Sequence, residues 1–275
     1  MSVLIGCCLA RTMTGQTPIL MACTLLAICI LMQASVNTFN DYFDFIKGTD
    51  TESDMLEADD STLINDRIDP RCALILGCGL LVGAFALGIW VIVRCGLIPL
   101  WIALIGAAAV VLYSAGKTPI SALPLGEVIS GVVMGGLIPI ACVYCLTGVL
   151  DLSVLAFAIP LIIGIGLIMM TNNTCDIEKD VRVDRHTLPA IIGRERARSA
   201  YHIALMLWMA SICIICTISF AHAAWVLPFL LLTCAPLAKV LWKNPLKPES
   251  RIAAMGGIAS LNVALGAFYA LCMVL

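Results

Sequence analysis

The sequence predicts an all-α, polytopic membrane protein. Of its 275 residues, 61% are hydrophobic and only 12% are charged, which is about half the charged fraction of a typical soluble domain. Several apolar runs are close to the roughly 20 residues that a helix needs to cross a bilayer. A backbone in the hydrocarbon layer must satisfy its own hydrogen bonds, and a helix does so within one segment. We therefore expect one bundle of membrane helices and a single domain over residues 1–275.

The apolar runs define the expected elements in order. The first run, from Ser2 to Ala10, is too short to span a membrane and resembles the second half of a helix. The second run, 18–46, is long enough for a helix that ends in polar residues, and an acidic loop over 47–70 follows it. The later predicted spans are 71–93, 97–115, 125–147, 152–174, 197–220, 224–241 and 252–274. Together these runs predict about nine transmembrane helices, of which the first is truncated.

The positive charges indicate the orientation. Fourteen of the sixteen Lys and Arg residues fall in the loops after the second, fourth, sixth and eighth spans, and only Arg11 and Arg94 lie on the other side. By the positive-inside rule, the cation-rich side faces the cytoplasm. We expect a multi-pass protein of the cell membrane, surrounded by membrane lipid, with its C-terminus outside. No nucleic-acid partner is expected, and the oligomeric state is left open.

Two polar stretches at the ends of apolar runs carry the candidate chemistry. In the first, Asn37-Thr-Phe-Asn40-Asp41-Tyr-Phe-Asp44, the Asn and Asp residues line one helical face. In the second, Asn172-Asn173-Thr-Cys-Asp176-Ile-Glu-Lys-Asp180, the same i, i+4 spacing of an Asn and an Asp recurs. Oxygen ligands of this kind suit Mg²⁺, which binds carboxylates, water and substrate phosphates. Two such faces on one side of the membrane predict a metal–diphosphate site at its surface.

Cations are also needed to bind the non-bridging oxygens of a diphosphate. Lys117 is the only cation in the loop after the fourth span, which favours it as a diphosphate ligand. Lys47, Arg182 and Arg185 are further candidates beside the acidic stretches.

Three segments carry a resemblance to a known family. The stretch Asn40-Asp41-Tyr-Phe-Asp44-Phe-Ile-Lys47-Gly48-Thr-Asp50 resembles the first motif of UbiA-type intramembrane prenyltransferases. It is most similar to the branch that prenylates 1,4-dihydroxy-2-naphthoate in menaquinone biosynthesis. The stretch from Asn172 to Asp180 resembles the second motif, and Tyr113-Ser114-x-x-Lys117 with Leu125-Gly126-Glu127 resembles the central segment. The likeness covers nearly the whole chain.

The resemblance implies a UbiA-like bundle of nine helices around a central cavity, with Mg²⁺ bridging two Asp-rich motifs and a polyprenyl diphosphate. Carried over by position, the metal-site residues are Asn40, Asp44, Asp176 and Asp180, supported by Asp41 and Asn173. Lys117 matches a diphosphate-contacting lysine, and with Asp44 and Asp176 it is expected to carry catalysis. Gly48 stands where the general family pattern has an Asp, and Asp50 or Asp54 is a candidate to replace it.

The implied reaction is a Mg²⁺-dependent transfer of a polyprenyl group from its diphosphate to a small aromatic acceptor, for which we expect 1,4-dihydroxy-2-naphthoate. Within the superfamily, the alternatives are a 4-hydroxybenzoate-like acceptor, haem, a sugar phosphate, or cyclisation of a terpene without an acceptor. A cation transporter is the alternative from another class. A transporter would place its ionisable groups near the midplane, whereas here they cluster at helix ends.

Overall fold

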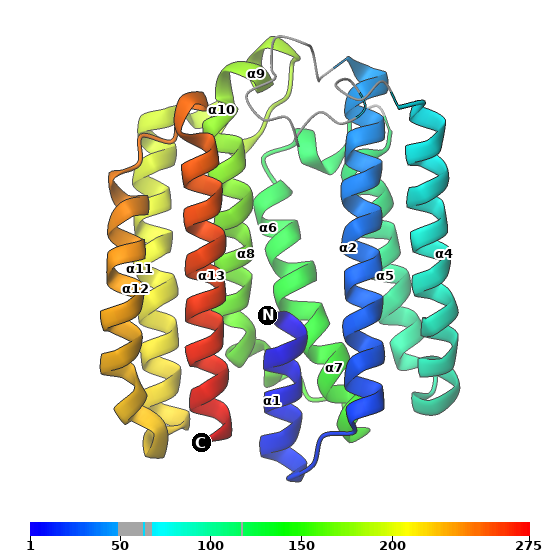
Figure 1. The fold of residues 1–275 in the computed structure, drawn as a ribbon, viewed down its shortest axis with the longest axis vertical. Coiled ribbons are helices and arrows are strands. Elements are labelled where there is room, and N and C mark those ends of the chain that lie inside the picture. Colours follow the sequence, from blue (N-terminus) through cyan, green and yellow to red (C-terminus); the bar gives the residue numbers. More distant parts are fainter. Residues whose placement is uncertain (49–62, 64–67, 117) are drawn as a thin grey trace.

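The computed structural model describes residues 1–48, 63, 68–116 and 118–275. Within these ranges every regular element is a helix. Figure 1 shows the long helices standing side by side in one bundle. The prediction of an all-α fold is therefore confirmed.

Seven helical segments of the described ranges are long and apolar enough to cross a membrane. They are α2 (Ile19–Lys47); α4 (Pro70–Cys95); α6 (Gly126–Ser130), η4 (Gly131–Leu137) and α7 (Ile138–Thr147) in one run; α8 (Val154–Cys175); α11 (Arg194–Ser219); η5 (Ala221–Val226) with α12 (Leu227–Lys243); and η6 (Pro248–Ser250) with α13 (Arg251–Val274). Each corresponds to a predicted span. The remaining predicted span is α5 (Ile98–Ser114), which rises about 25 Å and is shorter than the roughly 30 Å hydrocarbon layer.

The outer surface of the bundle is apolar. Ile218 on α11 is 76% exposed and Leu232 on α12 is 77% exposed. Large apolar side chains on so much of a surface are unfavourable in water but satisfied in lipid. The exposure pattern therefore fits a bundle that is surrounded by membrane.

The short helix α1 (Ser2–Thr14) is the predicted truncated first helix. In Figure 1 it occupies the lower half of the bundle, and the N-terminus lies at mid-height between α13 and α2. Ile5 and Leu9 of α1 belong to the buried core. A Cβ added at Gly6 would lie 2.6 Å from the Cys142 Cβ on α7, so α1 packs closely on α7.

The central run from α6 to α7 packs backbone to backbone on α8. A Cβ at Gly131 would lie 2.6 Å from the carbonyl oxygen of Ile162, and one at Gly135 would lie 2.5 Å from the Ile162 nitrogen. Both glycines lie in η4, a π-helical segment. α7 follows it, and the second residue of α7 is Pro139, which has no N–H for the helix. Small residues at such positions allow membrane helices to approach closely.

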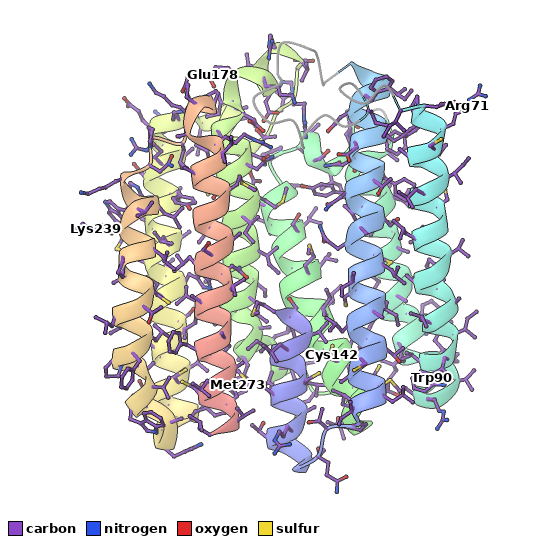
Figure 2. The ribbon with its side chains drawn as sticks, in the orientation of Figure 1. Arg71, Trp90, Cys142, Glu178, Lys239 and Met273 are labelled. Carbon is purple, nitrogen blue, oxygen red and sulfur yellow. The ribbon has the colours of Figure 1, made fainter. Side chains whose placement is uncertain are left out.

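Both acidic stretches lie at the same end of the bundle, the upper end in Figure 1. The short helices η3 (Ile120–Ala122), α9 (Ile177–Arg182) and α10 (Leu188–Ile192) are also at this end. Figure 2 places Arg71 and Glu178 here, and Trp90 and Met273 toward the opposite end. We call the upper end the motif end.

The backbone contact at Gly135 gives a first prediction. Gly135→Ala should lower the melting temperature of the detergent-solubilised protein, because the nearest atoms to the added Cβ are backbone atoms of α8 that cannot move aside cheaply. The matched control is Gly256→Ala on α13, where nothing lies within 4 Å of the new Cβ. The control should be neutral or stabilising by roughly 0.5–1 kcal/mol. Equal melting temperatures for the two variants would contradict the close contact.

Candidate active site

The first acidic stretch lies at the end of α2. The Ser114 hydroxyl donates to Asn40 Oδ1 at 2.5 Å, which joins α2 to the last residue of α5. Asp44, one turn further along α2, is half-buried, and Asp41 is exposed. The helix ends at Gly48 with a φ of 67°. Glycine adopts this left-handed conformation at little cost, which is a physical reason for a Gly where the general family pattern has an Asp.

The second acidic stretch crosses from α8 into α9. α8 ends at Cys175, so the stretch does not lie on one regular helix as the sequence suggested. Helical hydrogen bonds nevertheless continue through the junction, from the Asp176 N–H to the Asn172 carbonyl at 3.1 Å and from the Asp180 N–H to the Asp176 carbonyl at 2.8 Å. The i, i+4 register of Asn172, Asp176 and Asp180 is therefore kept.

Arg251, at the start of α13, lies against this second stretch. Its Nε is 3.2 Å from Asp176 Oδ1, and its Nη2 donates to Asn172 Oδ1 at 2.8 Å. The side chains of Asp176 and Arg251 are each only 19% exposed, so the pair is largely removed from water. By sequence, Arg251 is only one of the loop cations, because its partner is determined by the packing of α13 on α8.

Asp180 is the most buried carboxylate of the motif end among the described residues, with 3% exposure. Thr187 Oγ1 donates to its Oδ2 at 2.8 Å, and Arg185 Nε lies 3.6 Å from its Oδ1. Burial raises the pKa of the Asp180 carboxyl to about 6, against the opposing effects of Arg185 and of the Thr187 hydrogen bond. Arg185, a predicted diphosphate ligand, is thus held beside a predicted metal ligand, whereas Arg182 is exposed on α9.

Glu178 has a structural partner instead. Arg194 donates to both of its carboxylate oxygens, with Nη2 at 2.7 Å from Oε2, and Arg194 Nε also donates to the Leu246 carbonyl at 2.9 Å. The hydrogen bonds from Arg194 lower the pKa of the Glu178 carboxyl. This bidentate pair ties α9 to α11 and to the segment before α13.

Hydrogen bonds from the turn after α9 reach η3, near the central segment. Arg185 Nη2 donates to the Ser121 carbonyl at 3.1 Å, and the His186 N–H donates to the Ala122 carbonyl at 2.9 Å. The side chain that binds Asp180 therefore also fixes the polypeptide that enters α6.

The end of α5 contacts the helices of both acidic stretches. The Tyr113 hydroxyl donates to Met169 Sδ of α8 at 3.9 Å, and the next residue, Ser114, donates to Asn40 of α2. The helix that carries the first stretch and the helix that leads into the second therefore meet at the end of α5.

Asn173 points into the bundle toward α6. Its Nδ2 donates to Glu127 Oε1 at 2.9 Å, and each of the two residues is only 6% exposed. The amide nitrogen of this predicted supporting ligand is thus used on Glu127. In the sequence, Glu127 stood out only as part of the resemblance and as an acid within an apolar run.

Several predicted residues lie outside the described ranges. They are Lys117, Asp50 and Asp54, and the side chain of Lys47 is likewise not described. The roles predicted for them stay predictions.

The described acids do not form a metal site made by the protein alone. No three His, Cys, Asp or Glu side chains of these ranges lie close enough together to hold an ion. The donors at the motif end are nonetheless carboxylate and amide oxygens, and Mg²⁺ often takes only one or two carboxylates and completes its shell with water and phosphate. The residues present therefore fit a Mg²⁺ ion that is bound jointly with a phosphate group.

Comparison with known proteins agrees with this geometry. A model described as the UbiA prenyltransferase family matches residues 1–272. A 1,4-dihydroxy-2-naphthoate octaprenyltransferase of Bacillus subtilis (strain 168) is 28% identical over 272 residues, with 96% of this chain and 84% of that protein covered. UbiA prenyltransferase domain-containing protein 1 of Homo sapiens is 29% identical over 259 residues, with 88% of this chain and 70% of that protein covered.

Solved structures share the fold. A UbiA homolog from Archaeoglobus fulgidus bound to DMAPP and Mg²⁺ superimposes with a TM-score of 0.64 at 14% identity, over 99% of this chain and 94% of that chain. A structure of digeranylgeranylglyceryl phosphate synthase superimposes with a TM-score of 0.63 at 17% identity, over 99% and 92%. At these identities the likeness concerns the fold. Because the family model matches almost the whole chain, this protein belongs to the UbiA prenyltransferase family and is an enzyme that transfers prenyl groups.

Proposed function

We propose that this enzyme transfers a polyprenyl group from its diphosphate to 1,4-dihydroxy-2-naphthoate, with Mg²⁺ at the motif end and the reaction on the cytoplasmic side of the cell membrane. The observation that carries the proposal is the convergence of two acidic stretches at one end of the bundle, where the end of α5 contacts both α2 and α8. The acceptor is taken from the Bacillus subtilis relative, which is named for that reaction. Mg²⁺ is taken from the oxygen donors and from the Archaeoglobus fulgidus homolog, whose structure contains it.

The residues of the motif end divide into two groups by charge. The carboxylates of Asp44, Asp176 and Asp180 would hold the ion, with Asn40 and Asp41 beside them on α2. The cations would bind the non-bridging oxygens of the diphosphate; they are Lys47, Lys117, Arg182 and Arg185. When bound, Mg²⁺ supplies positive charge that stabilises the leaving diphosphate.

The proposed reaction breaks the C–O bond between the allylic carbon and the diphosphate, and the electron pair leaves with the diphosphate. A ring carbon of the acceptor then supplies the pair for the new C–C bond, and the proton that this carbon carried passes to the released diphosphate, which restores the aromatic ring. The apolar bundle below the motif end would hold the prenyl chain and keep water away from the allylic cation.

The shared metal site gives the second prediction. Asp44→Asn and Asp176→Asn should each abolish prenyl transfer and Mg²⁺-dependent binding of a non-hydrolysable prenyl thiolodiphosphate, because each removes a charged ligand from one site. The double variant should be little worse than either single variant, since both act on one transition state.

Asp184→Asn is the control for this pair. Asp184 lies in the turn after α9 with a side chain that is 96% exposed, and its positive φ of 56° is tolerated by Asn. It should keep wild-type transfer and binding. Full activity of Asp176→Asn, or of the wild type in EDTA, would contradict the metal site.

Arg251 gives the third prediction, as a residue that positions Asp176. Replacing a group that orients a metal ligand typically lowers metal affinity by about 10–100-fold. Arg251→Gln should therefore raise the Mg²⁺ concentration for half-maximal activity by about this factor, and Arg251→Lys should raise that concentration less. Arg194→Gln should instead lower the melting temperature with little change in the Mg²⁺ requirement, because Arg194 binds Glu178 and backbone carbonyls. Equal Mg²⁺ requirements in both glutamine variants would leave Arg251 a purely structural role.

The cytoplasmic orientation gives the fourth prediction. His186 at the motif end has a side chain that is 64% exposed, and His222 is exposed at the start of η5. In a background from which the native cysteines have been removed, a membrane-impermeant maleimide added to intact cells should label His222→Cys and not His186→Cys. Labelling of His186→Cys from outside would reverse the proposed orientation.

A further inference from the structure

Glu127 is a buried carboxylate that the proposed metal and diphosphate chemistry does not use. It is the second residue of α6 and is 6% exposed. A carboxylate buried within an apolar bundle is unfavourable unless hydrogen bonds or a cation compensate it. The partners of its two oxygens therefore indicate what the residue is for.

Among the described residues, only one of the two oxygens has a partner. Oε1 accepts from Asn173 Nδ2 at 2.9 Å. Oε2 is buried and accepts no hydrogen bond from any residue that the structure describes. The one partner is a neutral amide, so the carboxylate keeps one complete set of lone pairs that are shielded from water and available to a donor.

The position of Glu127 connects this free oxygen with the proposed reaction. Asn173 of α8 precedes Asp176 by three residues, which places it about 4.5 Å deeper in the bundle. A Cβ at Gly126, the residue before Glu127, would lie 3.8 Å from the Tyr113 hydroxyl near the end of α5. Glu127 therefore lies beside the second acidic stretch, on its membrane side and next to α5, where the group that meets the prenyl chain below the diphosphate would be.

The arrangement does not favour a metal ion as the partner of Glu127 Oε2. No three acidic, Cys or His side chains of the described ranges lie close enough together to share an ion, and this includes Glu127. A carboxylate of a substrate is also excluded as a neighbour, because two like charges at this depth repel strongly. A neutral hydroxyl group satisfies the free oxygen without either cost.

We propose that Glu127 binds a ring hydroxyl of the aromatic acceptor, with Oε2 accepting its hydrogen bond while Asn173 holds Oε1. This inference rests on the proposed function and goes beyond the metal–diphosphate site. The hydroxyl keeps its proton in this contact, and a hydrogen bond to an anionic oxygen raises the electron density of the ring that attacks the allylic carbon. The acceptor is thereby oriented with a hydroxyl toward Glu127 and its own carboxylate away from it.

The test compares three acceptors on two proteins. The acceptors are 1,4-dihydroxy-2-naphthoate and its two mono-O-methyl ethers, and the proteins are the wild type and Glu127→Gln. Loss of a charge-assisted hydrogen bond should raise the KM of Glu127→Gln for the dihydroxy acceptor by about 10-fold or more. For the wild type, one of the methyl ethers should have a KM that is higher than that of the dihydroxy acceptor by a similar factor. For Glu127→Gln, methylation of the same hydroxyl should raise the KM little further, because both changes remove the same contact.

Binding of the prenyl thiolodiphosphate with Mg²⁺ separates this inference from the proposed function. Glu127→Gln should bind it like the wild type, as should the control Glu249→Gln, an exposed carboxylate of η6 at the motif end. If the wild type does not bind it with Mg²⁺, the proposed function fails. If the wild type binds it, the inference about Glu127 fails when Glu127→Gln has the same acceptor KM as the wild type. The inference also fails when the increases in KM caused by the variant and by each methyl ether multiply.

Two further outcomes also overturn the inference. A raised Mg²⁺ requirement in Glu127→Gln with an unchanged acceptor KM would make Glu127 a metal ligand. If Glu127→Gln does not fold, Glu127→Asp is measured in the same way, because it keeps the charge but withdraws the oxygen by one methylene. An unchanged KM for the acceptor in Glu127→Asp would then contradict the contact.

Discussion

The backbone contact between the run from α6 to α7 and α8 determines where the candidate site lies. Around Gly131 and Gly135 no side chain separates the two helices, so their relative register is set by main-chain atoms that do not adapt as side chains do. The same close packing continues toward the motif end, where a Cβ at Gly166 would lie 3.3 Å from the Glu127 carbonyl oxygen. About two turns further along α8, Asn173 lies opposite the Glu127 side chain, and Asp176 directly follows the end of the helix. A shift of this register would misplace Glu127, Asn173 and Asp176 relative to one another.

The polar residues at the motif end are held by partners from other parts of the chain. Asn40 of α2 is bound by Ser114 of α5, Asp176 by Arg251 of α13, and Asp180 of α9 by Thr187 before α10. In a partly buried setting such contacts are stronger than in water, and they restrict the rotamers of the side chains that they join. The site is therefore positioned before substrate arrives, which is what catalysis by charge stabilisation requires.

Much of this could be predicted from the sequence. The helices follow from the lengths of the apolar runs, and the shared end of the acidic stretches follows from counting the spans between them. The helical i, i+4 register of Asn172, Asp176 and Asp180 is also present in the structure, because backbone hydrogen bonds continue across the junction from α8 to α9. The predicted span 152–174 ends within one residue of α8, but the separate helix α9 was not predicted, since no Gly or Pro in the stretch marks the junction. The pairing of Asn173 with Glu127 was not predicted either, because an amide next to an acidic motif fits a metal site equally well by sequence.

The sequence by itself determined the all-α membrane fold, the family and the residues that bring charge to one end. These follow from local rules: an apolar run of sufficient length must form a helix in lipid, and charged residues must stay near its ends. Only the tertiary structure decided which charges act on which. Arg251 is one of several loop cations by sequence, and it becomes the partner of Asp176 because α13 packs on α8. Glu127 is one acid in an apolar run by sequence, and α8 presents a single amide to it, so that within the described part of the chain its second oxygen is buried without a partner. Contacts between distant helices depend on packing geometry, and that geometry arises from the whole bundle rather than from any one segment.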